Sequence, residues 1–187
     1  MGGTAESRNK FVMELEAAAT KSGTKATDVA ARLVLEKPTI EEKKGSLPEI
    51  MVCFPSTQDR IDLYDALKQA DLRTLLSQAT TQDLLAKKDE GGLTAFYEAL
   101  PVGKDRSRFS AEVSKSIADE KGVASAAGYI SNLEMPEEQY AALEGVIMTD
   151  AGSPRALTEE EAKGLVKAGG KLSGEQKEVI ESLLRQK

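Results

Sequence analysis

Three near-identical pentapeptides recur along the chain, namely LYDAL (Leu63 to Leu67), FYEAL (Phe96 to Leu100) and QYAAL (Gln139 to Leu143). Apolar residues around them recur at the three- and four-residue spacing of amphipathic helices. The step from Leu63 to Phe96, which we call the repeat interval, is about 33 residues, a period typical of stacked helical hairpins. Such hairpins stack because each two-helix unit covers the apolar face of its neighbour. The pentapeptides are therefore predicted to mark the inner helices of a stack.

The remaining segments also favour helices. Phe109, Val113 and Ile117 follow one another at four-residue spacing, and Gly122 stands where that helix should end. The stretch LPEIMVCFP leaves a strand and a short buried helix both open, although its length and bounding prolines favour the helix. No segment shows consecutive alternating strands. We expect an all-α protein of about ten short helices, arranged as stacked hairpins or as a compact helical domain.

The tail of the chain carries clear helix start signals. Thr158 and Glu161 form the pattern of a capping box, and Ser173 and Gln176 repeat it. The stretch TDAGSPRAL before them is rich in turn-forming residues and is the predicted junction. The sequence therefore predicts a helical body over residues 1–150 and a C-terminal helical hairpin over residues 151–187.

The residue types that are present exclude several kinds of chemistry. The chain has no histidine and one cysteine, Cys53, which rules out Ser-His-Asp and Cys-His catalysis and a His/Cys zinc site. Cys53 lies in the apolar stretch EIMVCFP, which indicates packing in the core. A single cysteine cannot form an intramolecular disulfide. We expect no cofactor and no metal ion.

Charge and hydropathy limit the expected partners. The net charge of −6 opposes non-specific attraction to nucleic acid. The glutamates Glu159 to Glu161, which lead the first tail helix, argue against a helix–turn–helix that binds DNA. No apolar run is long enough for a membrane span, and the first residues lack the apolar core of a secretory signal. We expect a protein of the cytoplasm, or one delivered into a host cytoplasm, that binds no nucleic acid.

The stretch KDEGGLTAFYEAL resembles the start of an ankyrin repeat, whose family pattern reads Asp-x-x-Gly-x-Thr-Pro-Leu-His-x-Ala. The positions that coincide with this pattern are Asp89, Gly92, Thr94 and Ala99. The positions where Pro, Leu and His are replaced are Ala95, Phe96 and Tyr97. The resemblance covers residues 56–122. It implies that Gly92 forms a tight turn and that Thr94 caps the inner helix.

Stacked repeats present loop tips and inner helices as one continuous surface that can grip another protein. In ankyrin-type repeats the contacts lie just before and along the inner helix. The resemblance therefore implies a set of partner-binding residues, namely Tyr64, Asp65, Lys88, Glu90, Leu93, Tyr97 and Glu98. Tyrosine is favoured at interface hot spots, although each tyrosine also fits a core position on its helix. We expect a protein–protein interaction module or adaptor, and the irregular repeat spacing is similar to that of bacterial effector proteins.

An enzyme stays open as the alternative. It would use Asp, Glu, Arg or Tyr side chains on a helical scaffold, as a transferase or a ligase-type effector does. A cleft that holds carboxylates with strongly shifted pKa values would support this alternative. Since no catalytic motif is recognisable in the sequence, the residues favour a binding function.

Overall fold

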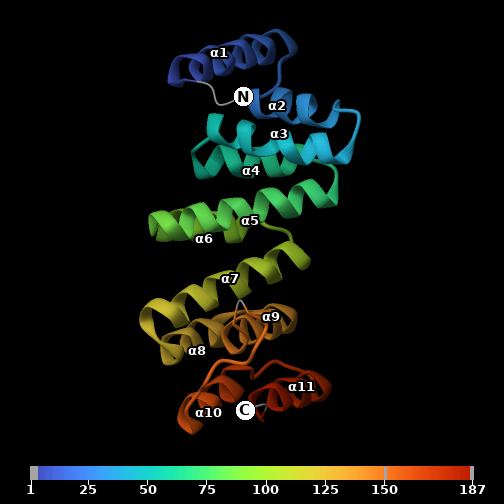
Figure 1. Cartoon of the computed structure of the whole chain (residues 1–187). Helices are drawn as coiled ribbons and strands as arrows, with labels where there is room; N and C mark the ends of the chain where they lie inside the picture. The colour runs from blue at the N-terminus through green and yellow to red at the C-terminus, as the bar shows by residue number, and fades with distance from the viewer. Residues whose placement is uncertain (1–3, 150, 186–187) are drawn as a thin grey trace. The chain divides into compact units, whose positions relative to one another are not determined.

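The computed structural model describes residues 4–149 and 151–185, and they contain eleven α-helices (Figure 1). The helices are α1 (Ala5–Ser22), α2 (Ala26–Leu35), α3 (Ile40–Cys53), α4 (Thr57–Ala66), α5 (Ala70–Lys87), α6 (Glu90–Ala99), α7 (Lys104–Lys121), α8 (Val123–Asn132), α9 (Pro136–Ile147), α10 (Glu159–Ala168) and α11 (Gly174–Arg185). These residues contain no β-strand, only an isolated antiparallel bridge between Met148 and Pro154. The predicted all-α class is confirmed. The ambiguous stretch LPEIMVCFP is helical up to Cys53, since it forms the end of α3.

The helix ends follow the local signals in the sequence. The Ser56 Oγ accepts a hydrogen bond from the Asp59 backbone N–H at 3.1 Å and so caps α4. The Thr158 Oγ1 accepts one from the Glu161 N–H at 3.2 Å, which confirms the capping box of α10. Gly122, with a φ of 87°, follows the last residue of α7 as predicted.

The start of α6 differs from the prediction. Gly92 was expected in a tight turn, but it is buried inside α6. Thr94 was expected to cap the helix, but its Oγ1 donates a hydrogen bond to the Glu90 carbonyl at 3.0 Å, one turn earlier in the same helix. The left-handed residue is Lys88, with a φ of 54°. The turn and the cap that the ankyrin resemblance implied are therefore wrong, because α6 begins at Glu90, before both residues.

The contacts divide the chain into two compact units. The first comprises Met1–Asp83 and Glu90–Ala99, and the second comprises Leu84–Asp89 and Leu100–Lys187. This division differs from the predicted boundary after residue 150. The physical reason is that α10 packs on α8 and α11 packs on α9, so the tail helices share a core with the helices before them. Helices α10 and α11 also pack on each other.

In the first unit, helices that are two apart in the chain pack together. Helix α4 packs on both α2 and α6, and α2 also packs on α1 and α3 (Figure 1). The buried positions of the three even-numbered helices recur at the repeat interval, as Ala30, Leu63 and Phe96 show. Val34 on α2 and Leu67 directly after α4 are a second buried pair at this interval. The same register therefore faces the core in α2, α4 and α6.

In the second unit, too, helices that are two apart in the chain pack together. Helix α9 packs on α7 and α11, while α8 packs on α7, α9 and α10. The approach of α7 to α9 is close at Gly145, where an added Cβ atom would lie 2.7 Å from the Ala111 carbonyl oxygen. The Ser114 Oγ donates a buried hydrogen bond to the Ala142 carbonyl at 2.9 Å, again between α7 and α9. Small and polar residues thus join these two helices tightly.

Candidate functional site

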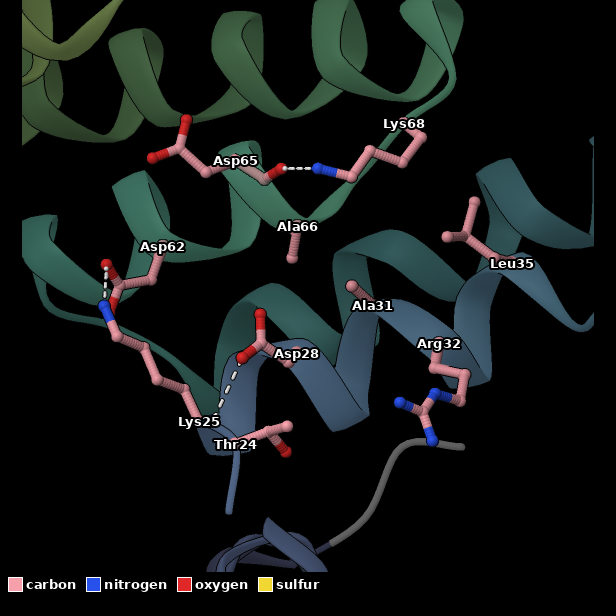
Figure 2. Close-up of a pocket in the computed structure, with 10 residues that line it drawn as sticks. All are labelled: Thr24, Lys25, Asp28, Ala31, Arg32, Leu35, Asp62, Asp65, Ala66 and Lys68. Atoms are coloured by element: carbon pink, nitrogen blue, oxygen red, sulfur yellow. Dashed lines mark hydrogen bonds and ion pairs between the residues drawn. The ribbon is translucent and has the colours of Figure 1, made fainter. Parts of the chain in front are cut away.

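A polar groove of about 550 Å³ lies between α2 and α4 (Figure 2). We call it the α2–α4 groove. The residues that line it are Thr24, Lys25, Asp28, Ala31, Arg32, Leu35, Asp62, Asp65, Ala66 and Lys68. Figure 2 shows the short side chains of Ala31 and Ala66 between the two helices, with the charged side chains around them. The groove therefore has a small apolar floor and a charged rim.

The bottom of the groove carries a small side chain, Ala31, where the other helices of the repeat carry tyrosine. Ala31 lies one repeat interval before Tyr64, and Tyr64 lies one repeat interval before Tyr97. Where α4 packs on α6, the Tyr64 ring fills the contact and its centroid lies 6.4 Å from that of Phe96. At the equivalent position on α2, Ala31 is only 1% exposed where α2 packs on α4. The bottom of the α2–α4 groove is thus formed by a small residue in a register that otherwise holds tyrosine.

Several charges on the rim already have partners. The Lys25 Nζ lies 2.8 Å from the Asp62 Oδ1, and this hydrogen bond is the main cause that raises the pKa of Lys25. The Lys25 backbone N–H donates to the Asp28 Oδ2 at 3.0 Å, at the start of α2. The Lys68 Nζ donates to the Asp65 backbone carbonyl at 3.0 Å. Lys25, Asp28 and Lys68 therefore each have a hydrogen-bond partner within the protein.

Two charges on the rim are left without such partners. Within the described part of the chain, neither the Arg32 guanidinium nor the Asp65 carboxylate forms a hydrogen bond or an ion pair. Both residues are exposed, and they lie one repeat interval apart on adjacent helices. After one more interval, the exposed Glu98 occupies the same register on α6. We call Arg32, Asp65 and Glu98 the charge row.

The carboxylates of the groove do not form a metal site. Asp28, Asp62 and Asp65 all line it, but no three His, Cys, Asp or Glu side chains of residues 4–149 and 151–185 are grouped so as to hold a metal ion. The arrangement is instead suited to pairing with charged groups of a ligand or a partner.

Among the residues predicted to bind a partner, Asp65 lines the groove and Tyr64 does not lie on the surface. Tyr64 is only 3% exposed, because α4 turns its ring toward Phe96 on α6, and the Arg73 Cζ lies 5.1 Å from the ring centroid. Tyr64 therefore occupies a core position in this structure, which does not support its predicted contact with a partner. Lys88 falls in the second unit, where its Nζ lies 3.0 Å from the Glu120 Oε2.

The other four predicted residues all lie on α6. Glu90 and Glu98 are exposed, whereas Leu93 and Tyr97 are half-buried and one turn apart on the helix. Since α6 packs on α4, the structure brings these four residues and Asp65 onto neighbouring helices of the first unit. Their part in binding stays a prediction.

The contribution of α2 was not predicted from the sequence. Asp28 and Arg32 on α2 and Lys25 directly before it line the groove, but α2 contains no copy of the pentapeptide. The signal was nevertheless present, because counting back one repeat interval from Asp65 leads to Arg32.

Two other cavities lie within single units. One of about 680 Å³ lies between α7 and α9 and is bordered by Lys104, Arg108, Glu137 and Glu144. The other, of about 420 Å³, is lined by residues of α1, α2 and α3 with an apolar portion, and Cys53 lies at its edge. Cys53 is half-buried rather than in the core.

One carboxyl group has an unusual environment. Burial raises the pKa of Glu112 on α7, although the nearby Arg108 and Lys115 oppose this effect. Glu112 lines none of the three cavities described above. A raised carboxyl pKa inside a pocket is what acid–base catalysis would require, and here the two features do not coincide.

The chain was compared with family models, curated proteins and solved structures, and none of them matches. None of the helices described for the chain is both long and apolar enough to cross a membrane.

Proposed function

We propose that this chain is a helical-repeat interaction module, or adaptor, that binds a partner protein through α2, α4 and α6 of its first unit. One observation carries the proposal. The three helices pack in succession and bury the same register at the repeat interval, as at Ala30, Leu63 and Phe96. Their exposed positions then also repeat, and stacked helices of this kind present an extended binding surface.

The chemistry of this surface supports recognition of a protein. Leu93 and Tyr97 expose part of their apolar side chains on α6, and tyrosine is among the residues enriched at interface hot spots. The charge row adds one cation and two anions on three neighbouring helices. Charges arranged in this way discriminate between partners and guide association more than they add affinity. Of the features that the ankyrin resemblance implied, only the repeat interval supports the proposal. The turn at Gly92 and the cap at Thr94 do not, because both residues lie inside α6.

Affinity capture with variants on α6 tests the proposal. The immobilised full chain is exposed to a cell lysate, and the captured proteins are compared between the wild type, Tyr97→Ala and Glu98→Arg. Glu178→Arg on α11 is the matched charge-reversal control, because Glu178 is exposed and belongs to the second unit. We expect one partner to be captured by the wild type and the control and to be lost from both α6 variants. Equal capture by all four proteins would contradict the proposed surface.

A further inference from the structure

The α2–α4 groove has room for a segment of a partner. Its volume of about 550 Å³ falls within the range of roughly 300–1,000 Å³ that is usual for ligand sites. Ala31 is almost fully buried at the bottom of the groove, and the part-exposed Leu35 and Ala66 supply its apolar surface. Apolar surface of this kind packs well against the aliphatic part of a long charged side chain, whose charged end then reaches the rim.

The charges on the rim determine what can cover the groove. Lys25 and Asp62 pair with each other, so an occupant that covers them leaves neither charge uncompensated, and the cost is that of desolvating the pair. Asp65 and Arg32 have no hydrogen bond or ion pair from their charged groups within the described residues, and covering either without an opposite charge would carry a desolvation cost. The occupant must therefore bring a cation to Asp65 and an anion to Arg32.

Occupants with charges of one sign fit less well. A purely basic segment would leave Arg32 facing like charges, and a purely acidic segment would do the same to Asp65. A metal ion is disfavoured because the three aspartates of the groove do not converge. Charge complementarity thus selects a segment that carries both signs.

We infer that the α2–α4 groove binds a short segment of the partner protein in which a basic side chain pairs with Asp65 and an acidic side chain pairs with Arg32. This inference rests on the proposed function and specifies its partner. Asp65 comes from α4 and Arg32 from α2, and Figure 2 shows them on either side of the alanine floor. The segment lies over Ala31 and Ala66 and joins the two helices.

Selection from a library of random peptides displayed on phage, with the full chain as bait, tests the inference. The enriched peptides are expected to contain at least one Lys or Arg and at least one Asp or Glu. The affinity of an enriched peptide is then measured by fluorescence anisotropy. We expect Asp65→Arg and Arg32→Glu each to weaken binding about tenfold, since each replaces an attraction with a repulsion. Glu178→Arg, the control on α11, should bind as the wild type does.

Charge exchange between peptide and protein gives the decisive comparison. A peptide whose basic residue is replaced by Glu should bind Asp65→Arg more tightly than it binds the wild type. Absence of enrichment, enrichment without charge preference, or failure of this exchange would each overturn the inference. The capture experiment with Tyr97 and Glu98 is independent of these outcomes, because both residues lie on α6 and neither lines the groove. The interaction function can therefore stand while the inference about the groove fails.

Discussion

The Tyr64 ring meets the Phe96 ring edge-on, with the centroids 6.4 Å apart and the ring planes at 85°. Tyr64 is the second residue of LYDAL and Phe96 is the first residue of FYEAL, so the two pentapeptides meet where α4 packs on α6. Arg73 adds a third element, because its Nε donates a hydrogen bond to the Leu67 carbonyl at 2.6 Å while its guanidinium lies near the Tyr64 ring. Tyr64 therefore joins α4, α5 and α6.

Replacement of Tyr64 should destabilise the protein more than replacement of Tyr97. Tyr64→Ala would leave a cavity at a side chain that is 3% exposed, and we expect it to lower the free energy of unfolding by about 3 kcal/mol or more. Tyr97→Ala should cost clearly less, since that ring is only half-buried. Urea denaturation followed by circular dichroism measures both values. Equal losses would show that Tyr64 is not a core residue.

Gly145 should tolerate no side chain. An added Cβ atom would lie 2.7 Å from the Ala111 carbonyl, so Gly145→Ala must push α7 and α9 apart, and we expect a loss of about 1–3 kcal/mol in the free energy of unfolding. Gly128→Ala is the matched control, because Gly128 lies inside α8 with open space around its Cβ position. There alanine should be neutral or should stabilise by up to about 1 kcal/mol. Similar effects at both glycines would contradict the close approach.

The cap of α10 should depend on pH. The Glu161 Oε2 accepts hydrogen bonds from the Thr158 backbone N–H and from its Oγ1, each at 2.8 Å, and these bonds lower the pKa of Glu161. Because the folded-state pKa lies below the unfolded value, the charged cap stabilises the folded state above the unfolded pKa. This stabilisation is lost as the pH falls through the folded pKa, which lies below the ordinary value for a glutamate.

Glu161→Gln tests this dependence, since the glutamine can still accept a hydrogen bond but cannot titrate. The wild type should be the more stable protein at neutral pH, and the difference should shrink on acidification. Denaturation curves from neutral pH to about pH 3 provide the comparison, because this range spans the usual carboxyl values. A difference that stays constant across the range would disprove the role assigned to the charge.

The thiol of Cys53 should react slowly. Burial raises its pKa, Glu49 adds to the effect and Arg8 opposes it, so a smaller fraction than usual is thiolate at a given pH. The Sγ also donates to the Glu49 carbonyl at 3.5 Å. We expect iodoacetamide to alkylate the native protein more slowly than the urea-unfolded chain at a mildly alkaline pH, as followed by mass spectrometry. Equal rates would mean that the native thiol is as accessible and as acidic as a free one.

The helices and their ends could be predicted from the sequence because their signals are local. Thr158 and Glu161 lie one turn apart, and Phe109 and Val113 become buried on one face of α7 as the spacing indicated. The start of α6 was less predictable. The ankyrin resemblance implied a tight turn at Gly92, but the chain turns earlier, at Lys88. Local propensity alone does not determine where such a helix begins.

The third pentapeptide shows how a sequence match can mislead. Leu67 and Leu100 each follow the last residue of their helix, whereas Leu143 lies inside α9. Gln139, the first residue of QYAAL, is buried and its Nε2 donates to the Ile130 and Leu133 carbonyls, both at 3.2 Å. Gln139 therefore supplies hydrogen bonds to carbonyl groups at the C-terminal end of α8, whereas the first residues of LYDAL and FYEAL are apolar and pack in the core. This hydrogen bonding depends on a neighbouring helix, which the sequence pattern does not reveal.

The candidate site was predictable only in part. The resemblance named Asp65, which is exposed, but it could not show that α6 covers Tyr64 or that α2 contributes Arg32. A helical pattern indicates which residues share a face, whereas the identity of the covering helix depends on tertiary packing. Nor could the spacing show that residues of α2 and α4 border one groove, because that depends on which helices are adjacent.

Amide hydrogen exchange, measured by mass spectrometry on the chain alone and in complex with its captured partner, tests the proposed surface most directly. We expect the partner to slow exchange in residues 26–35, 57–66 and 90–99, the helices that carry the charge row. Residues 174–185 should exchange at the same rate in both states, because α11 belongs to the second unit. Protection confined to the second unit, with α2, α4 and α6 unchanged, would contradict the account.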